Sequence, residues 1–184
     1  MKTFTIIAGI NGTGKSSLTG VLKGQLDDLG IIVDADRLTR ERAGGDSFRG
    51  GRLAVERIRS CLAKGVCFTQ ETTLCGFTTA RKASAAGYRI RLFYVGLNTL
   101  DECQARIRNR VSRGGHDIPA DVVARRFARR WPAVAEVLPY CDEAVFYDNY
   151  NGFVEVAEYR NGELLLKGDY RPDWILELRD YLNT

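Results

Sequence analysis

The stretch Gly9-Ile10-Asn11-Gly12-Thr13-Gly14-Lys15-Ser16 decides the fold of this chain. It fits the pattern G-x-x-x-x-G-K-[ST], and a predicted strand before it and a predicted helix after it argue against a chance match. Before it, residues 2–8 form a short β-rich run that becomes fully apolar. After it, residues 16–29 carry apolar side chains at helical spacing, and Gly30 ends the pattern. Residues 31–33 are the next strand candidate, so the chain opens with a βαβ unit.

A loop of this composition is suited to binding phosphate. Glycines let the backbone curl tightly, so that consecutive N–H groups and the positive end of the following helix point at one anion. We predict that Lys15 reaches the β- and γ-phosphates of a nucleotide and that the Ser16 hydroxyl binds Mg²⁺. No NKxD-like guanine-reading segment is present, which favours ATP. The predicted ATP contacts are Gly9, Asn11, Gly12, Thr13, Gly14, Lys15, Ser16 and Ser17.

The rest of the chain continues to alternate strands and helices. Strands are expected at 66–69, 88–97 and 144–147, and helices at 53–64, 78–86, 99–110 and 121–131. Residues 40–51, which contain four glycines, are expected to form a mobile loop or a broken turn. Asn161-Gly162 indicates a β-hairpin. The pattern predicts one three-layer α/β domain over residues 1–184, similar to a nucleotide kinase. Its parts are a mostly parallel five-stranded sheet, a helical flap at about 104–131, and a C-terminal hairpin plus helix at about 153–184.

Composition excludes several other classes of protein. With 184 residues, of which 45% are hydrophobic and 27% charged, the chain is neither collagen-like nor disordered. No apolar run approaches the ~18 residues of a membrane-spanning helix, and the N-terminus does not fit a secretory signal. Five cysteines without a CxxC pair suit a reducing compartment, and a single histidine argues against a zinc site. We therefore expect a cytoplasmic protein with no membrane partner.

Two acidic residues are expected at the ligand-binding edge of the sheet. Asp36 follows the second strand and Glu71 the third, and ligands bind at the carboxyl ends of parallel strands. A kinase needs a carboxylate that takes the proton of the acceptor hydroxyl and acidic groups that hold hydrated Mg²⁺. Asp36 suits the first role and Glu71 the second, and Thr72 is expected beside the substrate. Alternatively, Asp36 is a turn or cap residue and Glu71 is a surface carboxylate. Alternation places Asp34 on the same face as Asp36.

Arginines are concentrated in one segment of the chain. Residues 106–130 contain eight arginines and two aspartates and so carry +6, whereas the whole chain carries +4. In small kinases a flap at this position closes over ATP and brings arginines to the transferring phosphoryl group. Arginines 125 and 129 are spaced i,i+4, as are 126 and 130, so each pair shares one helix face. The predicted catalytic residues are Lys15, Asp36, Arg113, Arg125 and Arg126.

Together these segments resemble the zeta toxin family of P-loop kinases, particularly its short chromosomal members. The resemblance covers roughly residues 4–150 in the expected order. Its motifs GGHDIP and ETTL are more particular than the glycine loop. It is carried by residues 8–18, Asp34-Ala35-Asp36-Arg37, Glu71-Thr72-Thr73-Leu74, Ala86-Gly87-Tyr88-Arg89-Ile90, Gly114-Gly115-His116-Asp117-Ile118-Pro119 with Arg125-Arg126, and Tyr147-Asp148-Asn149.

The resemblance implies ATP-dependent phosphorylation of a sugar hydroxyl, which in the best-known members belongs to UDP-N-acetylglucosamine. It also implies an antitoxin-type inhibitor protein as a partner. By this analogy Lys15 binds phosphate, Asp36 is the general base, Glu71 assists the metal or the substrate, and Arg113 with Arg125 or Arg126 clamps the phosphoryl group.

Three hypotheses about function follow from these observations. The leading one is a Mg²⁺-ATP-dependent kinase whose small-molecule acceptor is a nucleotide-activated amino sugar. The second is a nucleic-acid end kinase, because the basic segment can bind a phosphate backbone; only Phe127 and Trp131 are interleaved with its arginines, which disfavours a nucleic-acid partner. The third is a non-catalytic, ATP-dependent interaction module, against which the co-location of Asp36, Glu71 and the late arginines argues.

Overall fold

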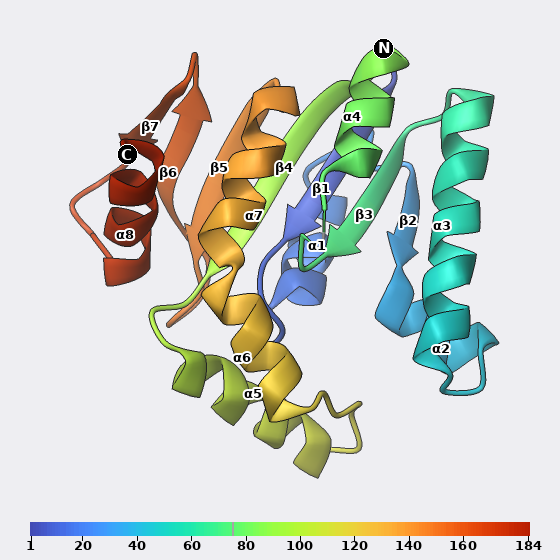
Figure 1. The fold of residues 1–184 in the computed structure, drawn as a ribbon, viewed down its shortest axis with the longest axis horizontal. Coiled ribbons are helices and arrows are strands. Elements are labelled where there is room, and N and C mark those ends of the chain that lie inside the picture. The colour runs from blue at the N-terminus through green and yellow to red at the C-terminus, as the bar shows by residue number, and fades with distance from the viewer. Residues whose placement is uncertain (75) are drawn as a thin grey trace.

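The computed structural model describes residues 1–74 and 76–184, which contain one seven-stranded β-sheet (Figure 1). The strand order is β2-β3-β1-β4-β5-β6-β7. The first five strands along this order are parallel. They are β2 (Ile31–Asp34), β3 (Phe68–Thr72), β1 (Thr3–Ala8), β4 (Arg89–Gly96) and β5 (Glu143–Asp148).

The predicted hairpin forms, but it extends the main sheet, so the prediction of five strands is wrong. Strand β6 (Val154–Arg160) pairs antiparallel with β5, and β7 (Glu163–Leu166) pairs with β6. The turn between them has positive φ at Asn161 (53°) and Gly162 (86°), as a two-residue hairpin loop requires. Because only a short connection separates β5 from β6, the chain folds straight back onto the sheet edge.

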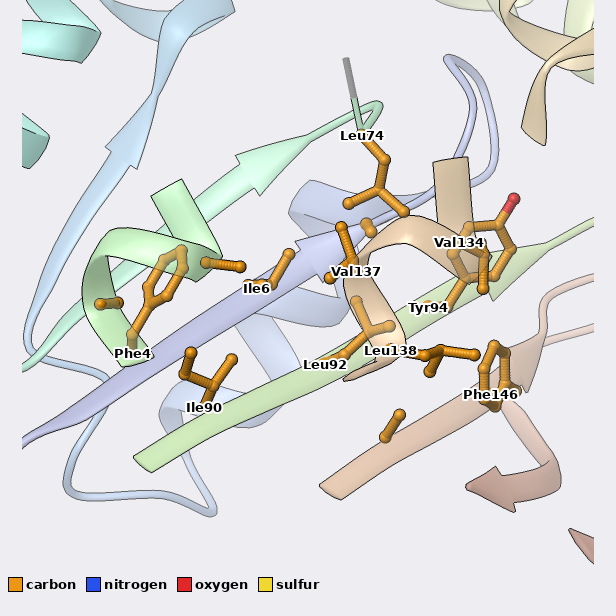
Figure 2. Packing of buried hydrophobic residues seen from close by; sticks show 14 of the residues in the cluster. Phe4, Ile6, Leu74, Ile90, Leu92, Tyr94, Val134, Val137, Leu138 and Phe146 are labelled. Atoms are coloured by element: carbon orange, nitrogen blue, oxygen red, sulfur yellow. The ribbon is translucent and has the colours of Figure 1, made fainter. Parts of the chain in front are cut away.

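Helices cover both faces of the parallel strands, as predicted for a three-layer fold. Helix α1 (Lys15–Lys23) lies behind the sheet in Figure 1, whereas helices of the later chain lie in front. Figure 2 shows the front core, in which Leu92 and Tyr94 of β4 face Val134 and Val137. Alternation along the strands sends the neighbouring side chains to the opposite face, against α1. The front helices are α3 (Ser47–Lys64), α4 (Thr78–Ala85), α7 (Arg130–Val137) and α8 (Asp173–Leu182).

The predicted loop at 40–51 is wrong. Helix α2 (Ala35–Arg42) occupies its start, and α3 begins at Ser47. Asp46 caps α3 with its carboxylate, which accepts bonds from two backbone N–H groups of the first turn (2.9 and 3.1 Å). A Cβ atom at Gly50 would collide with Thr39 of α2. This glycine therefore permits close contact between two helices rather than marking a loop.

Two other predicted helices differ from the structure, and a third starts where it was expected. Helix α1 ends at Lys23, well before residue 29. The helix predicted at 121–131 is two helices, α6 (Ala120–Ala128) and α7, followed by the short 3₁₀ helix η1 (Leu138–Tyr140). Helix α5 (Leu100–Ser112) starts with a capping box formed by Thr99 and Glu102, as the sequence predicts. None of the helices in the described ranges is both long and apolar enough to cross a membrane.

The C-terminal helix α8 is anchored by Trp174. Its indole N–H donates to Asp148 at the end of β5 (2.8 Å), and its backbone N–H donates to the Asn98 side chain (3.2 Å). The buried indole ring lies directly on Gly96 of β4 and stacks with Trp131 of α7, with ring centroids 6.2 Å apart. The helix is thereby fixed at the carboxyl end of the parallel strands.

Gly96→Ala should therefore destabilise the protein. A Cβ at this position would collide with the Trp174 indole, and overpacking of this kind costs about 1–3 kcal/mol in the free energy of unfolding. Gly20→Ala in α1 is the matched control because the space around Gly20 is open; it should stabilise by about 0.5–1 kcal/mol. Urea denaturation measures both changes. Equal denaturation midpoints for the two variants would contradict the packing described for Trp174.

Candidate functional site

A cavity of about 400 Å³ opens at the carboxyl ends of the parallel strands. It is formed by the glycine loop between β1 and α1, the end of β3, the start of α2, and helices α5 and α6. Helices α5 and α6 lie together beyond this end of the sheet (Figure 1), where the sequence predicted a flap. The predicted site residues that line the cavity are Asn11, Gly12, Gly14, Lys15, Ser16, Ser17, Asp36, Glu71, Thr72 and Arg126.

Three glycines give the loop its shape. Gly9, Gly12 and Gly14 have φ angles of 145°, 89° and 103°, in the region that side chains disfavour. A Cβ at Gly12 would collide with the backbone of Cys103 on α5, and one at Gly14 with the Asn149 side chain. The loop is therefore both strongly curved and closely surrounded, which requires glycine at these positions.

Lys15, the first residue of α1, is held by the loop that precedes it. Its Nζ donates to the carbonyl oxygens of Gly9 (2.9 Å) and Ile10 (3.3 Å). Burial lowers the pKa of Lys15, and the negative charges of Asp36 and Glu71 oppose this effect. A phosphate in the cavity would add a further partner for the buried ammonium and would also face the positive end of α1.

Glu71 connects the end of β3 to α1. One carboxylate oxygen accepts a hydrogen bond from the Ser16 hydroxyl (2.7 Å), and the other accepts one from Thr19 (2.6 Å). Thr19 was not among the predicted site residues, although its spacing of three residues from Ser16 places both hydroxyls on one helix face. Thr72 also lines the cavity, and its hydroxyl accepts a bond from the backbone N–H of Leu74 (3.0 Å).

Asp34 and Asp36 have different local roles. The Asp34 carboxylate caps α2 by accepting bonds from the backbone N–H groups of Asp36 (2.9 Å) and Arg37 (3.2 Å). The expected strand-like alternation does not extend to Asp36, because the chain turns into α2 at Ala35. Asp36 lies in the first helical turn, with an exposed side chain that lines the cavity. Burial, and next the charge of Glu71, raise the pKa of Asp34.

Of the three predicted catalytic arginines, the structure brings only Arg126 to this cavity. Its guanidinium donates to the Asn11 side chain in the glycine loop (2.7 Å). Arg113 is an exposed residue just after α5 and lies outside the cavity lining. Arg125 is exposed and lies 3.4 Å from Asp121. Consecutive residues of a helix point in different directions, and Arg126 reaches this cavity whereas Arg125 does not.

Three arginines that were not predicted line the cavity: Arg40, Arg106 and Arg110. Arg106 donates to the backbone carbonyl of Asn149 (2.5 Å), and Arg110 donates to that of His116 (2.6 Å). Their i,i+4 spacing on α5 was a usable signal for a shared face. Arg40 was not predicted as a site residue because its segment was expected to be a loop.

Asn149 fixes the glycine loop from the end of β5. Its side-chain N–H donates to the carbonyl oxygen of Thr13 (2.7 Å). Thr13 is buried, and its hydroxyl donates to the carbonyl oxygen of Ile10 (2.9 Å). Thr13 and Gly9, both predicted ATP contacts, are absent from the cavity lining, so in this structure they shape the loop from within.

The described residues fit Mg²⁺ only in company with phosphates. No group of three or more His, Cys, Asp or Glu side chains among them forms a complete metal site. Kinases usually hold Mg²⁺ through one or two protein oxygens together with the nucleotide phosphates. The Ser16 hydroxyl and the Glu71 carboxylate, 2.7 Å apart at the cavity, are oxygen donors of this kind.

Comparison with known proteins supports the fold. No protein-family model matches the chain. An uncharacterized protein of Haemophilus influenzae is 29% identical over 126 residues, covering 65% of this chain and 88% of that protein. A chain from the PezAT chromosomal toxin–antitoxin system of Streptococcus pneumoniae matches with a TM-score of 0.63 and 14% identity, over 99% of this chain and 86% of that one.

A second structural similarity is to a chain of the Pnkp1/Rnl/Hen1 RNA repair complex. The TM-score is 0.58 at 15% identity, over 72% of this chain and 45% of that chain. This chain therefore corresponds to less than half of that larger one. Together with the glycine loop, these similarities show that the chain has the fold of the P-loop kinases.

Because the pKa of Asp34 is raised in the folded protein, the stability of Asp34→Asn relative to wild type should depend on pH. A carboxyl group whose pKa is higher in the folded state loses stabilising effect as pH rises through that pKa. The variant cannot ionise and its amide can still cap α2. Its advantage over wild type should be absent below pH about 3.9 and should grow toward neutral pH.

Urea unfolding at several pH values measures this difference. Asp46→Asn, at the equivalent cap of α3 but away from the cavity, controls for the loss of a capping carboxylate. If Asp34→Asn instead loses stability relative to wild type as pH rises, the description of Asp34 is wrong.

Proposed function

We propose that this protein is an ATP-dependent kinase that transfers the γ-phosphate of ATP to a hydroxyl of a small molecule, with Asp36 as the general base. The observation that supports it best is that Asp36, Lys15 and Arg126 line one cavity. A carboxylate, the lysine of the phosphate loop and an arginine from a separate helix are the groups that phosphoryl transfer needs. A module that only binds ATP does not need the carboxylate.

Each group has a role that follows from its chemistry. Lys15 and the backbone N–H groups of the loop would hold the β- and γ-phosphates, and Arg126 would stabilise charge on the transferring group. Asp36 would take the proton of the acceptor hydroxyl as the new O–P bond forms. The bond from phosphorus to the bridging oxygen breaks at the same time, and ADP leaves. Mg²⁺, held on the protein side by Ser16 and Glu71, would neutralise phosphate charge.

The acceptor that we propose is a nucleotide-activated amino sugar, similar to UDP-N-acetylglucosamine. Support comes from the sequence resemblance to zeta toxins and from the similarity in fold to the chain of a toxin–antitoxin system. Gln70 and Thr72 line the same cavity as Asp36 and carry groups that can bond sugar hydroxyls. An antitoxin-type inhibitor is the protein partner that the same resemblance suggests, and the cytoplasm is the proposed location.

A nucleic-acid end kinase is the second candidate. It is favoured by the arginine-rich segment and by the similarity in fold to a chain of an RNA repair complex. This candidate predicts that affinity for an oligonucleotide with a 5′-hydroxyl falls steeply with salt, because counterions are released on binding. A small acceptor that contacts few cations would show a much weaker dependence.

Asp36→Asn tests the assignment of the base. Phosphoryl transfer to UDP-N-acetylglucosamine, measured by ADP release, should fall ~10²-fold or more, the scale expected for loss of a general base. ATP binding, measured by calorimetry, should be nearly intact. Asp46→Asn removes a similar capping-region carboxylate outside the cavity and should retain activity. A parallel loss of ATP binding and turnover in Asp36→Asn would assign Asp36 a structural role instead.

A further inference from the structure

A second cavity, of about 530 Å³, adjoins the first. It lies between the segment that follows β3, helix α6 and the start of α7. Thr73 and Arg126 line both cavities. One extended ligand can therefore occupy the two at once.

All three arginines of α6 and its end line the second cavity. Arg126 also lines the first cavity and bonds Asn11, whereas Arg125 and Arg129, one helical turn apart, line only the second. Within residues 1–74 and 76–184, the Arg129 guanidinium has no hydrogen bond or ion pair. In the same ranges Arg125 has only its exposed pair with Asp121 at 3.4 Å, which solvent screens. Both guanidinium groups can therefore bind a ligand without breaking a strong contact.

The junction of α6 and α7 is fixed from its other side. Arg130 forms an ion pair with Glu177 of α8 (2.6 Å). Its guanidinium also lies over the rings of Phe127 (3.8 Å to the centroid) and Trp131 (4.3 Å). These contacts hold the backbone that carries Arg129, so the second cavity has a defined cationic wall.

The remaining lining of the second cavity is mainly apolar. Leu74, Val122, Pro132 and two alanines contribute hydrocarbon surface. Among the described residues of this lining, Glu136 is the only acidic one beside the three arginines. This combination fits a ligand that has a ring or similar apolar part next to an anionic group. A neutral monosaccharide would leave the arginines without a partner.

With Asp36 as the base, the strand order indicates that the acceptor, and not ATP, reaches this cavity. The glycine loop follows β1, and Asp36 follows β2, which lies beyond β3. The acceptor hydroxyl must meet the base, so the acceptor lies on the β3 side of the phosphates. The second cavity also opens beside the end of β3, at Thr73 and Leu74. The opposite side of the loop is bounded by Asn149 at the end of β5.

We propose that the second cavity binds the non-reacting part of the acceptor and that Arg125 and Arg129 bind a phosphate or diphosphate group there. The inference rests on the proposed kinase function. It assigns Arg125, which does not reach the transferring phosphate, to acceptor selection. A nucleoside diphosphate derivative has both the ring and the anion that this cavity fits.

Binding is tested separately from transfer. The protein is saturated with Mg²⁺ and a non-hydrolysable ATP analogue, which fills the glycine loop, and UDP is then titrated by calorimetry. UDP should bind wild type, and Arg129→Gln should weaken it by about tenfold or more through loss of a charge-assisted hydrogen bond. Arg108→Gln removes the same charge from an exposed site on α5 that lines neither cavity. It should leave the affinity within about twofold.

Kinetics provide a second readout. The wild-type KM for UDP-N-acetylglucosamine should be lower than that for N-acetylglucosamine, and Arg129→Gln should reduce this difference by about tenfold without changing the KM for ATP. Urea denaturation confirms that the variants fold.

The outcomes distinguish failure of this inference from failure of the proposed kinase function. Failure of UDP to bind the saturated protein, or equal weakening by Arg129→Gln and Arg108→Gln, would overturn the inference. Arg129-dependent binding of a short oligonucleotide without binding of UDP would also overturn it, in favour of a nucleic-acid acceptor. Arg129-dependent UDP binding with no transfer to any acceptor would contradict the kinase function while supporting the anion site.

Discussion

The shape of the turn after β1 is the constraint on which the rest of the site depends. Its glycines adopt positive φ angles that allow the backbone to surround an anion, and two side chains from distant parts of the chain hold it. Asn149 bonds the carbonyl of Thr13 from the end of β5, and Arg126 bonds Asn11 from α6, each at 2.7 Å. Because the bond from Arg126 also ties α6 to the loop, one of the interactions that hold the loop also holds a wall of the cavity.

The C-terminal helix α8 stabilises the helices next to the cavity. Helix α8 fixes α7 through the stacked pair Trp131 and Trp174 and through the ion pair of Glu177 with Arg130. Helix α7 directly follows α6, so α8 supports the segment that carries the site arginines. Trp174 in turn needs the flat surface of Gly96 on β4. A small helix remote from the glycine loop thus helps to define the geometry of the cavity.

The features that could be predicted from the sequence are local ones. The βαβ opening, the turn at Asn161-Gly162 and the positions of most strands depend on residues close together in the chain. The loop predicted at 40–51 was wrong because the role of Gly50 depends on Thr39 of a neighbouring helix, which no local pattern reveals. The seven-strand sheet was missed because joining the hairpin to β5 is a tertiary event. Helical spacing placed arginines 125 and 129 on one face of the predicted helix and arginines 126 and 130 on another. It could not show which face turns to the glycine loop, because that depends on how α6 packs.

Mass spectrometry of a panel of nucleotide sugars, incubated with the protein and Mg²⁺-ATP, shows whether the protein phosphorylates a nucleotide sugar. Lys15→Ala provides the blank, because it removes the ammonium held at the phosphate loop. A UDP-amino sugar should gain the mass of one phosphate with wild type and gain nothing with the blank. No gain on any panel member, with ATP still bound, would contradict the proposed transfer to a nucleotide sugar.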